Sequence, residues 1–143
     1  MKLTFDQSQC FSVPETLCQL LNDELAKISV PDCNTGGIIF NFRDLDYSSS
    51  LGGYHPVEAR LVKHLSQGKE LWQFEYITDF SYQGFPHAEL VKEIDVCFRT
   101  KRVYNLYAGY LGRQDANELV ALFLGNFVSY YQMNAFTVAV SFD

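Results

Sequence analysis

The spacing of apolar residues along this 143-residue chain changes several times, and each change marks a different element. The first pattern recurs every three or four residues, which predicts an amphipathic helix. Its apolar stripe consists of Leu17, Leu20, Leu21, Leu25 and Ile28. Ser12 is a candidate N-cap, and Glu15 would complete a capping box. Pro31 and Asp32 predict the end of this helix.

A second helical pattern begins near Asp115, a candidate N-cap with Glu118 at the third helical position. Its apolar residues are Leu119, Val120, Leu122, Phe123, Leu124, Phe127, Val128, Tyr130 and Tyr131. Because this apolar face is wide, we expect a sheet to cover one side of the helix and a neighbouring subunit to cover the other.

Elsewhere apolar and polar residues alternate, which is the period of a half-buried strand. The alternating segments are 38–42, 57–61, 70–82, 89–99 and 136–142. The longest of them places five aromatic residues on one predicted face: Trp72, Phe74, Tyr76, Phe80 and Tyr82. We expect this long strand to bend, and its aromatic face to pack in the core under a helix.

Turns are expected at Asn34–Gly37, at Gln67–Gly68 and at Thr100–Lys101, the last leading into the Tyr-rich segment 103–111. The predicted order is one helix, about five strands, a second helix and a final strand. Strands joined by short turns favour an antiparallel meander with the helices on one face. We therefore predict one α+β domain over residues 1–143, with a twisted antiparallel sheet of about five or six strands flanked by an N-terminal and a C-terminal helix.

Hydrophobic residues make up 48% of the chain and charged residues 20%, which excludes a disordered protein. No apolar run approaches the roughly 20 residues that span a bilayer, and the N-terminus lacks the apolar stretch of a signal peptide. The net charge of −6 argues against a nucleic-acid partner, although Arg99, Lys101 and Arg102 form one small basic cluster. We expect a cytoplasmic protein that binds neither nucleic acid nor a membrane.

The cysteines and the known short motifs give little indication of chemistry. Cys10, Cys18, Cys33 and Cys97 form no CxxC pair, so a zinc site among them is not indicated, and without export we expect free thiols. The chain has no GxGxxG motif, P-loop or GxSxG elbow, which removes the commonest nucleotide-binding and hydrolase interpretations.

The segment 41–58 concentrates polar side chains around a Ser- and Gly-rich loop. Its ligand-binding candidates are Arg43, Asp44, Tyr54, His55 and Glu58. In a catalytic interpretation, His55 is a general base oriented by Asp44 or Asp46, with a serine among 48–50 as nucleophile. In the structural interpretation, which we favour, Asp44 binds loop amides, Arg43 pairs with an acid, and glycines 52–53 turn the chain.

His64 and His87 are the other two histidines. A metal site could be drawn from these two histidines with Asp79 and Glu89, but four such residues can be found in most domains. However, His55 and His64 are nine residues apart, which is not the spacing of two ligands on a helix. We therefore expect no metal and no cofactor.

One run of residues, together with a weaker pattern in the second helix, resembles a known family. The residues concerned are Asn41–Asp44, Ser48, Gly52–Glu58, Asn126–Phe127 and Tyr130–Tyr131. They resemble a family of small uncharacterised bacterial proteins found on mobile genomic islands, the domain of unknown function 2787, and the resemblance covers nearly the whole chain. It implies a fold similar to the mitochondrial acidic matrix glycoproteins, which bind proteins and form ring-shaped trimers. This chain is shorter and lacks long acidic insertions, and the family offers no catalytic residues to transfer.

Three hypotheses about function follow. The first is a non-enzymatic interaction protein that binds a protein partner or itself, expected as a homo-oligomer, because the charge is low, the second helix is broadly apolar, and Tyr and Phe are abundant. Its interface candidates are Phe123, Phe127, Tyr130 and Tyr131. The alternative is a small enzyme or ligand-binding protein with a site in the loop 44–58. The third, nucleic-acid binding through the basic cluster, is opposed by the acidic balance.

Overall fold

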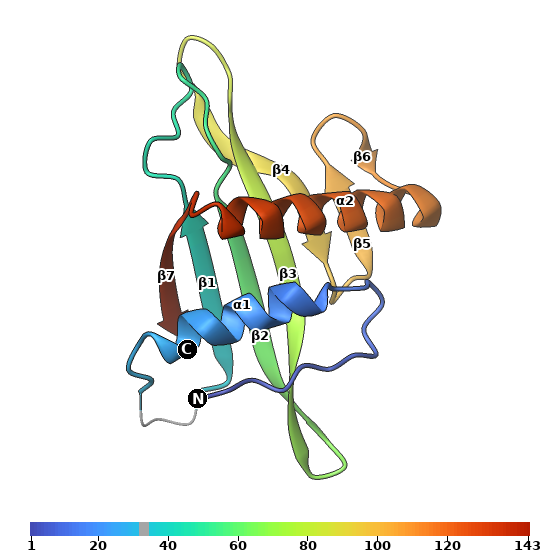
Figure 1. The fold of residues 1–143 in the computed structure, drawn as a ribbon. Helices are drawn as coiled ribbons and strands as arrows, with labels where there is room; N and C mark the ends of the chain where they lie inside the picture. Colours follow the sequence, from blue (N-terminus) through green and yellow to red (C-terminus); the bar gives the residue numbers. More distant parts are fainter. Residues whose placement is uncertain (32–34) are drawn as a thin grey trace.

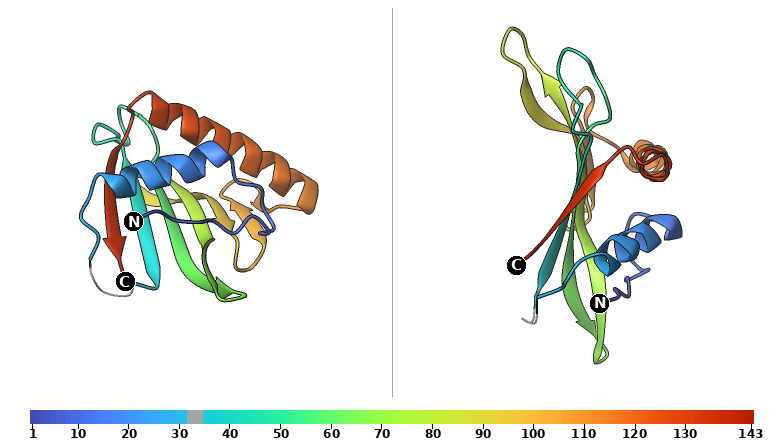
Figure 2. Two further views of the ribbon diagram at one scale, coloured as in Figure 1. Left: turned by 60° about the horizontal axis from the view of Figure 1, so that its bottom comes forward. Right: turned by 60° about the vertical axis from the view of Figure 1, so that its left-hand side comes forward.

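The computed structural model describes residues 1–31 and 35–143, which form an antiparallel sheet with two helices on one of its faces (Figures 1 and 2). The helices are α1 (Glu15–Ala26) and α2 (Arg113–Gln132). The strands are β1 (Gly37–Arg43), β2 (Val57–Ser66), β3 (Lys69–Gln83), β4 (Glu89–Cys97), β5 (Arg102–Asn105), β6 (Gly109–Tyr110) and β7 (Thr137–Phe142). The predicted α+β fold is confirmed, although the described sheet has seven strands rather than five or six.

The strand order is β6-β5-β4-β3-β2-β1-β7, so the first six strands form the predicted meander. The turn at Gln67 and Gly68 joins β2 to β3, and both residues have positive φ angles, 50° and 76°. α2 then runs across the strands to the opposite edge of the sheet, where β7 pairs antiparallel with β1 (Figure 1). Within the described residues, neither helix is long and apolar enough to cross a membrane.

Both helices pack their apolar faces onto the same side of the sheet. Leu17, Leu21 and Leu25 of α1 are buried, as are Val120 and Leu124 of α2. The inner residues of β1, which are Ile38, Phe40 and Phe42, lie beneath them in the same apolar cluster. The Tyr131 hydroxyl donates a hydrogen bond to Glu24, which joins α2 to α1.

The helix ends differ from the sequence predictions. α1 begins after Pro14 without a side-chain cap, so the predicted capping box of Ser12 is wrong. It ends at Ala26, which leaves Ile28 outside the helix and exposed. α2 begins after Gly112, so Asp115 lies in the first turn and is not the N-cap.

Two β-bulges determine which side chains of β3 and β4 face the helices. Leu61 of β2 pairs with Phe74, but the preceding Arg60 pairs with Tyr76, so Glu75 is an extra residue. An extra residue reverses the alternation of faces. The prediction that the aromatic residues of 72–82 share one face is therefore wrong: Tyr76 and Glu58 hydrogen bond on the opposite face.

After this first bulge, Ile77 lies in the core and Asp79 faces α2. A second bulge follows between β3 and β4. Asp79 pairs with Ile94, but Phe80 pairs with Lys92, which makes Glu93 the extra residue. Both bulges bring acidic residues toward the helix side of the sheet.

Among the described cysteines, Cys10, Cys18 and Cys97 are free thiols, as expected. Burial raises the pKa of Cys18 to about 11, so its thiol stays protonated near neutral pH. Three positions in the sequence predictions lie outside the described residues: Asp32 at the helix end, Cys33, and Asn34 in the first turn.

Candidate functional site

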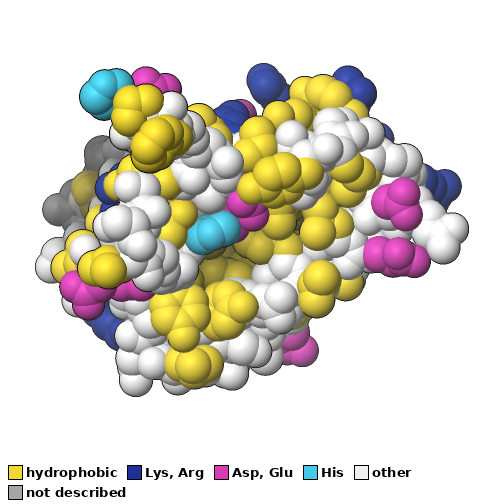
Figure 3. Space-filling model, turned by 90° about the horizontal axis from the view of Figure 1, so that it is seen from above, with side chains coloured by type: hydrophobic (Ala, Val, Ile, Leu, Met, Phe, Trp, Pro, Cys, Tyr) yellow, Lys and Arg dark blue, Asp and Glu magenta, His cyan; other side chains and the backbone are white. Residues whose placement is uncertain are grey.

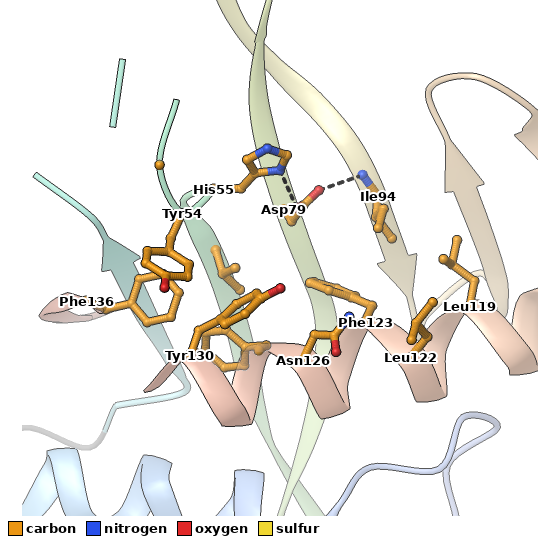
Figure 4. Close-up of a pocket in the computed structure, with 13 residues that line it drawn as sticks. Tyr54, His55, Asp79, Ile94, Leu119, Leu122, Phe123, Asn126, Tyr130 and Phe136 are labelled. Atoms are coloured by element: carbon orange, nitrogen blue, oxygen red, sulfur yellow. Dashed lines mark hydrogen bonds and ion pairs between the residues drawn. The ribbon is translucent and has the colours of Figure 1, made fainter. Parts of the chain in front are cut away.

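A cavity of about 340 Å³ opens between α2 and the segment that precedes β2 (Figure 4). Its lining is mostly apolar: Gly53, Tyr54, His55, Val57, Asp79, Ile94, Leu119, Leu122, Phe123, Asn126, Phe127, Tyr130 and Phe136. A volume of this size with few polar groups is typical of a binding site.

Helical spacing explains one wall of the cavity. The lining residues of α2 lie three or four positions apart, so they share one side of the helix. They are Leu119, Leu122, Phe123, Asn126, Phe127 and Tyr130. The facing wall is Tyr54, whose ring lies 4.8 Å from the ring of Tyr130 and 6.2 Å from that of Phe136. Aromatic contacts of this kind hold the loop against the end of α2.

The polar end of the cavity is a histidine bound to an acid (Figure 4). His55 Nδ1 lies 2.9 Å from Asp79 Oδ2 and 3.7 Å from Glu93 Oε2. Asp79 is only 7% exposed, and its other oxygen accepts the Ile94 backbone N–H at 3.1 Å. Both carboxylate oxygens of Asp79 are therefore engaged, and its side chain is fixed in position.

The hydrogen bond with Asp79 raises the pKa of His55 above its ordinary value of 6.5, while burial acts in the opposite direction. The negative charges of Asp79 and Glu93 add to the rise. The contact with Asp79 thus stabilises the protonated imidazole relative to a free one, and with Nδ1 donating to Asp79 the other ring nitrogen, Nε2, is available to a bound group.

The loop 44–56 is organised by Asp44. Its carboxylate accepts the backbone N–H groups of Asp46 and Tyr54, each at 3.0 Å. Gly53 has a φ of 133°, and a Cβ there would lie 2.8 Å from Asp44 Oδ2. These contacts confirm the structural interpretation of Asp44, which sets the position of the residues next to His55.

The catalytic interpretation of this loop is not supported by its contacts. The acid that binds His55 is Asp79, not Asp44 or Asp46. Ser48 belongs to a tight turn, because its hydroxyl accepts the Leu51 N–H at 3.0 Å and its backbone is paired with Gly52.

Arg43 and Glu58 do not belong to the cavity. Both lie on the sheet face opposite the helices, where Arg43 Nε donates to Asn41 Oδ1 at 2.9 Å. Glu58 accepts hydrogen bonds from Asn41 and Tyr76. The predicted pairing of Arg43 with an acid is wrong: its hydrogen-bond partner is an amide. Of the five ligand-binding candidates, Tyr54 and His55 line the cavity.

The interface candidates on α2 have different environments. Phe123 and Phe127 are buried and form the cavity wall, and Tyr131 is turned toward α1. Tyr130 is exposed, and so is Leu122 at 62%. The exposed candidates on α2 are therefore Leu122 and Tyr130, whereas the two phenylalanines are buried.

Two exposed apolar side chains of α2, Leu122 and Tyr130, line this cavity. The loop after β1 and the β3–β4 hairpin carry further exposed apolar side chains: Leu45, Leu51, Tyr82 and Phe85. The loop and the hairpin rise above α2 at the upper end of Figure 1. Figure 3 looks down on this end and shows hydrophobic side chains around a hollow that contains a histidine.

The sequence prediction missed Asp79 as a partner of His55, and it missed Glu93 altogether. His64 and His87 are exposed, so the histidines do not converge. The cluster that forms instead is His55, Asp79 and Glu93. The one available signal was the length of the strand 70–82, which predicted a bend without giving its position.

A family model described as a protein of unknown function, DUF2787, matches residues 15–141. The hypothetical protein VC0508 from the Vibrio cholerae VSP-II pathogenicity island is 34% identical to this chain, with a TM-score of 0.89 over 99% of this chain and 100% of that one. The conserved hypothetical protein VC1805 from V. cholerae pathogenicity island VPI-2 is 28% identical, with a TM-score of 0.71 over 93% and 97% of the two chains. VC1805 is described as sharing structural homology with the human P32 protein. No curated protein matches the chain.

Proposed function

Because this chain belongs to the DUF2787 family of proteins of unknown function, we propose its role from its surface: it is a non-enzymatic, cytoplasmic interaction protein that self-associates through the end that carries the cavity. The observation that carries this proposal is the set of exposed apolar side chains on α2, the loop after β1 and the β3–β4 hairpin, the elements at the cavity end of the sheet. Large apolar side chains that gather on one surface, next to a hollow, mark protein interaction sites.

The partner that fits this surface is a second copy of the chain. Phe85, in the connection between β3 and β4, is 97% exposed, so each chain carries an aromatic side chain without a packing partner of its own. Each chain also carries an apolar cavity of about 340 Å³ that can receive an aromatic ring. We assign Phe85 of one copy to the cavity of the next.

A contact of this kind joins two different surfaces, so each copy can bind two neighbours. Such head-to-tail contacts close into rings when the rotation between neighbours permits. The resemblance of the family to the mitochondrial acidic matrix glycoproteins, which form ring-shaped trimers, supports this arrangement.

A ligand-binding protein or small enzyme is the second candidate, because His55 and Asp79 form a hydrogen-bonded pair at the cavity. In that case the cavity holds a small molecule whose polar group binds His55 Nε2, with Tyr54 and Phe136 against its apolar part. A cavity occupied by a small molecule predicts a monomer in solution, which separates this candidate from the first.

Solution mass by light scattering, at increasing protein concentration, tests the proposal. The wild type is expected to be an oligomer, and Leu122→Asp a folded monomer, because Leu122 lies at the cavity mouth and its side chain is largely exposed. The matched control is Leu65→Asp in the β2–β3 hairpin at the opposite end, where Leu65 is 69% exposed. A wild type that stays monomeric, or an equal loss of mass in both variants, contradicts the proposal.

A further inference from the structure

Three potential metal ligands converge at the polar end of the cavity. One ligand atom each from His55, Asp79 and Glu93 lies within 4.8 Å of the other two. They come from three separate segments: the end of the loop before β2, the middle of β3, and β4. His55 Nδ1 is 2.9 Å from the nearer Asp79 oxygen and 3.7 Å from the nearer Glu93 oxygen.

This convergence depends on both β-bulges. The bulge at Glu75 turns Asp79 to the helix side of the sheet, and Glu93 is itself the extra residue of the second bulge. Bulges re-aim side chains, and they are over-represented next to functional sites. Because both bulges are needed to bring these side chains together, the cluster is a specific feature of the fold.

The charge at this point favours a cation. Asp79 is largely buried and Glu93 is half-buried, so the two carboxylates lie close together where solvent has little access. Among the ion pairs of the described residues, those of Asp79 and Glu93 are with His55, and no Lys or Arg joins them. Once an ion has displaced the imidazole proton, the neutral ring and the two carboxylates carry a charge of −2, which a divalent ion would balance.

We propose that His55, Asp79 and Glu93 bind one divalent transition-metal ion of the zinc class. Tetrahedral ligands at Zn–N and Zn–O distances of about 2.1 Å lie roughly 3.4 Å apart, and the separations of His55 Nδ1 from Asp79 and from Glu93 lie on either side of this value. The ion takes the place of the proton between Nδ1 and Asp79. One nitrogen with two oxygens suits zinc and its neighbours better than calcium, which takes six to eight oxygen ligands.

The surroundings hold these ligands in position. The second oxygen of Asp79 accepts the Ile94 N–H at 3.1 Å, and the other oxygen of Glu93 accepts the Tyr107 hydroxyl at 3.4 Å. Hydrogen bonds of this kind orient metal ligands and tune their affinity. Three protein ligands leave a fourth position toward the cavity for water or a bound group. This site does not depend on self-association, and the two proposals can fail separately.

Isothermal titration calorimetry with Zn²⁺, on wild-type protein first freed of metal with a chelator, tests the site. We expect one ion per chain, and a loss of affinity of ~10-fold or more in Glu93→Gln and in His55→Gln. His64→Gln is the matched control, because His64 is exposed and lies on the part of β2 that leads into the hairpin at the far end of the sheet. Its affinity is expected to equal that of the wild type.

A second measurement needs no variant. Mn²⁺ added to the wild type is expected to broaden the backbone amide signals of His55, Asp79 and Ile94 before those near His64. Absence of Zn²⁺ binding, unchanged affinity in Glu93→Gln and His55→Gln, or broadening centred elsewhere would overturn the proposal.

Discussion

At the scale of single residues, His55 is the group whose chemistry depends most on its neighbours. Asp79 fixes its Nδ1, Glu93 adds negative charge, and the ring of Tyr47 lies 5.4 Å from the imidazole. No helical or strand periodicity in the sequence places any of these three residues beside His55. Asp79 and Glu93 are 24 and 38 positions away, which local periodicity does not connect.

The raised pKa of His55 predicts a pH dependence. A raised pKa in the folded state means that the protonated form stabilises the fold, and this stabilisation is complete below 6.5. It is lost as the pH rises through the raised pKa of the folded state. NMR titration of the imidazole should therefore give a pKa above 6.5, and Glu93→Gln should lower it because one negative charge is removed.

The free energy of unfolding should show the same pH dependence. The free energy of unfolding of the wild type, relative to His55→Gln, should be largest at acidic pH and should decrease toward alkaline pH. A pKa for His55 at or below 6.5, with a difference in stability that grows with pH, would be inconsistent with the Asp79 contact.

At the scale of elements, alternation and helical periodicity in the sequence predicted the helices and most of the strands. The sequence predicted the strands β1, β2, β3, β4 and β7, both helices and the turn at Gln67–Gly68. It did not predict the two bulges, because an extra residue at Glu75 or Glu93 is stabilised by pairing with the neighbouring strand. The capping prediction for Ser12 failed because Pro14 occupies the N-cap position, two residues after Ser12.

The loop 44–56 is the element that positions His55, and Gly53 is its most constrained residue. Gly53→Ala should lower the free energy of unfolding by about 2–3 kcal/mol, because φ = 133° is unfavourable for a residue with a Cβ and the methyl group would meet Asp44 and Tyr47. Chemical denaturation measures this loss.

Gly52→Ala is the matched control within the same loop. Its φ is 73° and nothing lies within 4 Å of the added methyl group, so the expected loss is about 1 kcal/mol. Equal losses at the two positions would show that the contact with Asp44 does not hold the loop as described.

At the scale of the whole molecule, the sequence identified the family and the fold, both of which are confirmed. It indicated that α2 would carry an interface, but the periodicity of an apolar helix does not show which side remains exposed. Phe123 and Phe127 are covered by the sheet and the loop, whereas Leu122 and Tyr130 remain at the surface. The exposed apolar side chains at the cavity end of the sheet come from three separate elements, which are α2, the loop after β1 and the β3–β4 hairpin.

Mixing two complementary variants tests the central claim most directly. Phe85→Ser removes the inserted side chain but keeps the cavity, and Leu122→Asp alters the cavity mouth but keeps Phe85. Each variant alone should be a monomer by sedimentation velocity, and an equimolar mixture should form a heterodimer and nothing larger, because only one intact contact remains. A mixture that stays monomeric, or single variants that assemble as the wild type does, would contradict the insertion of Phe85 into a neighbouring cavity.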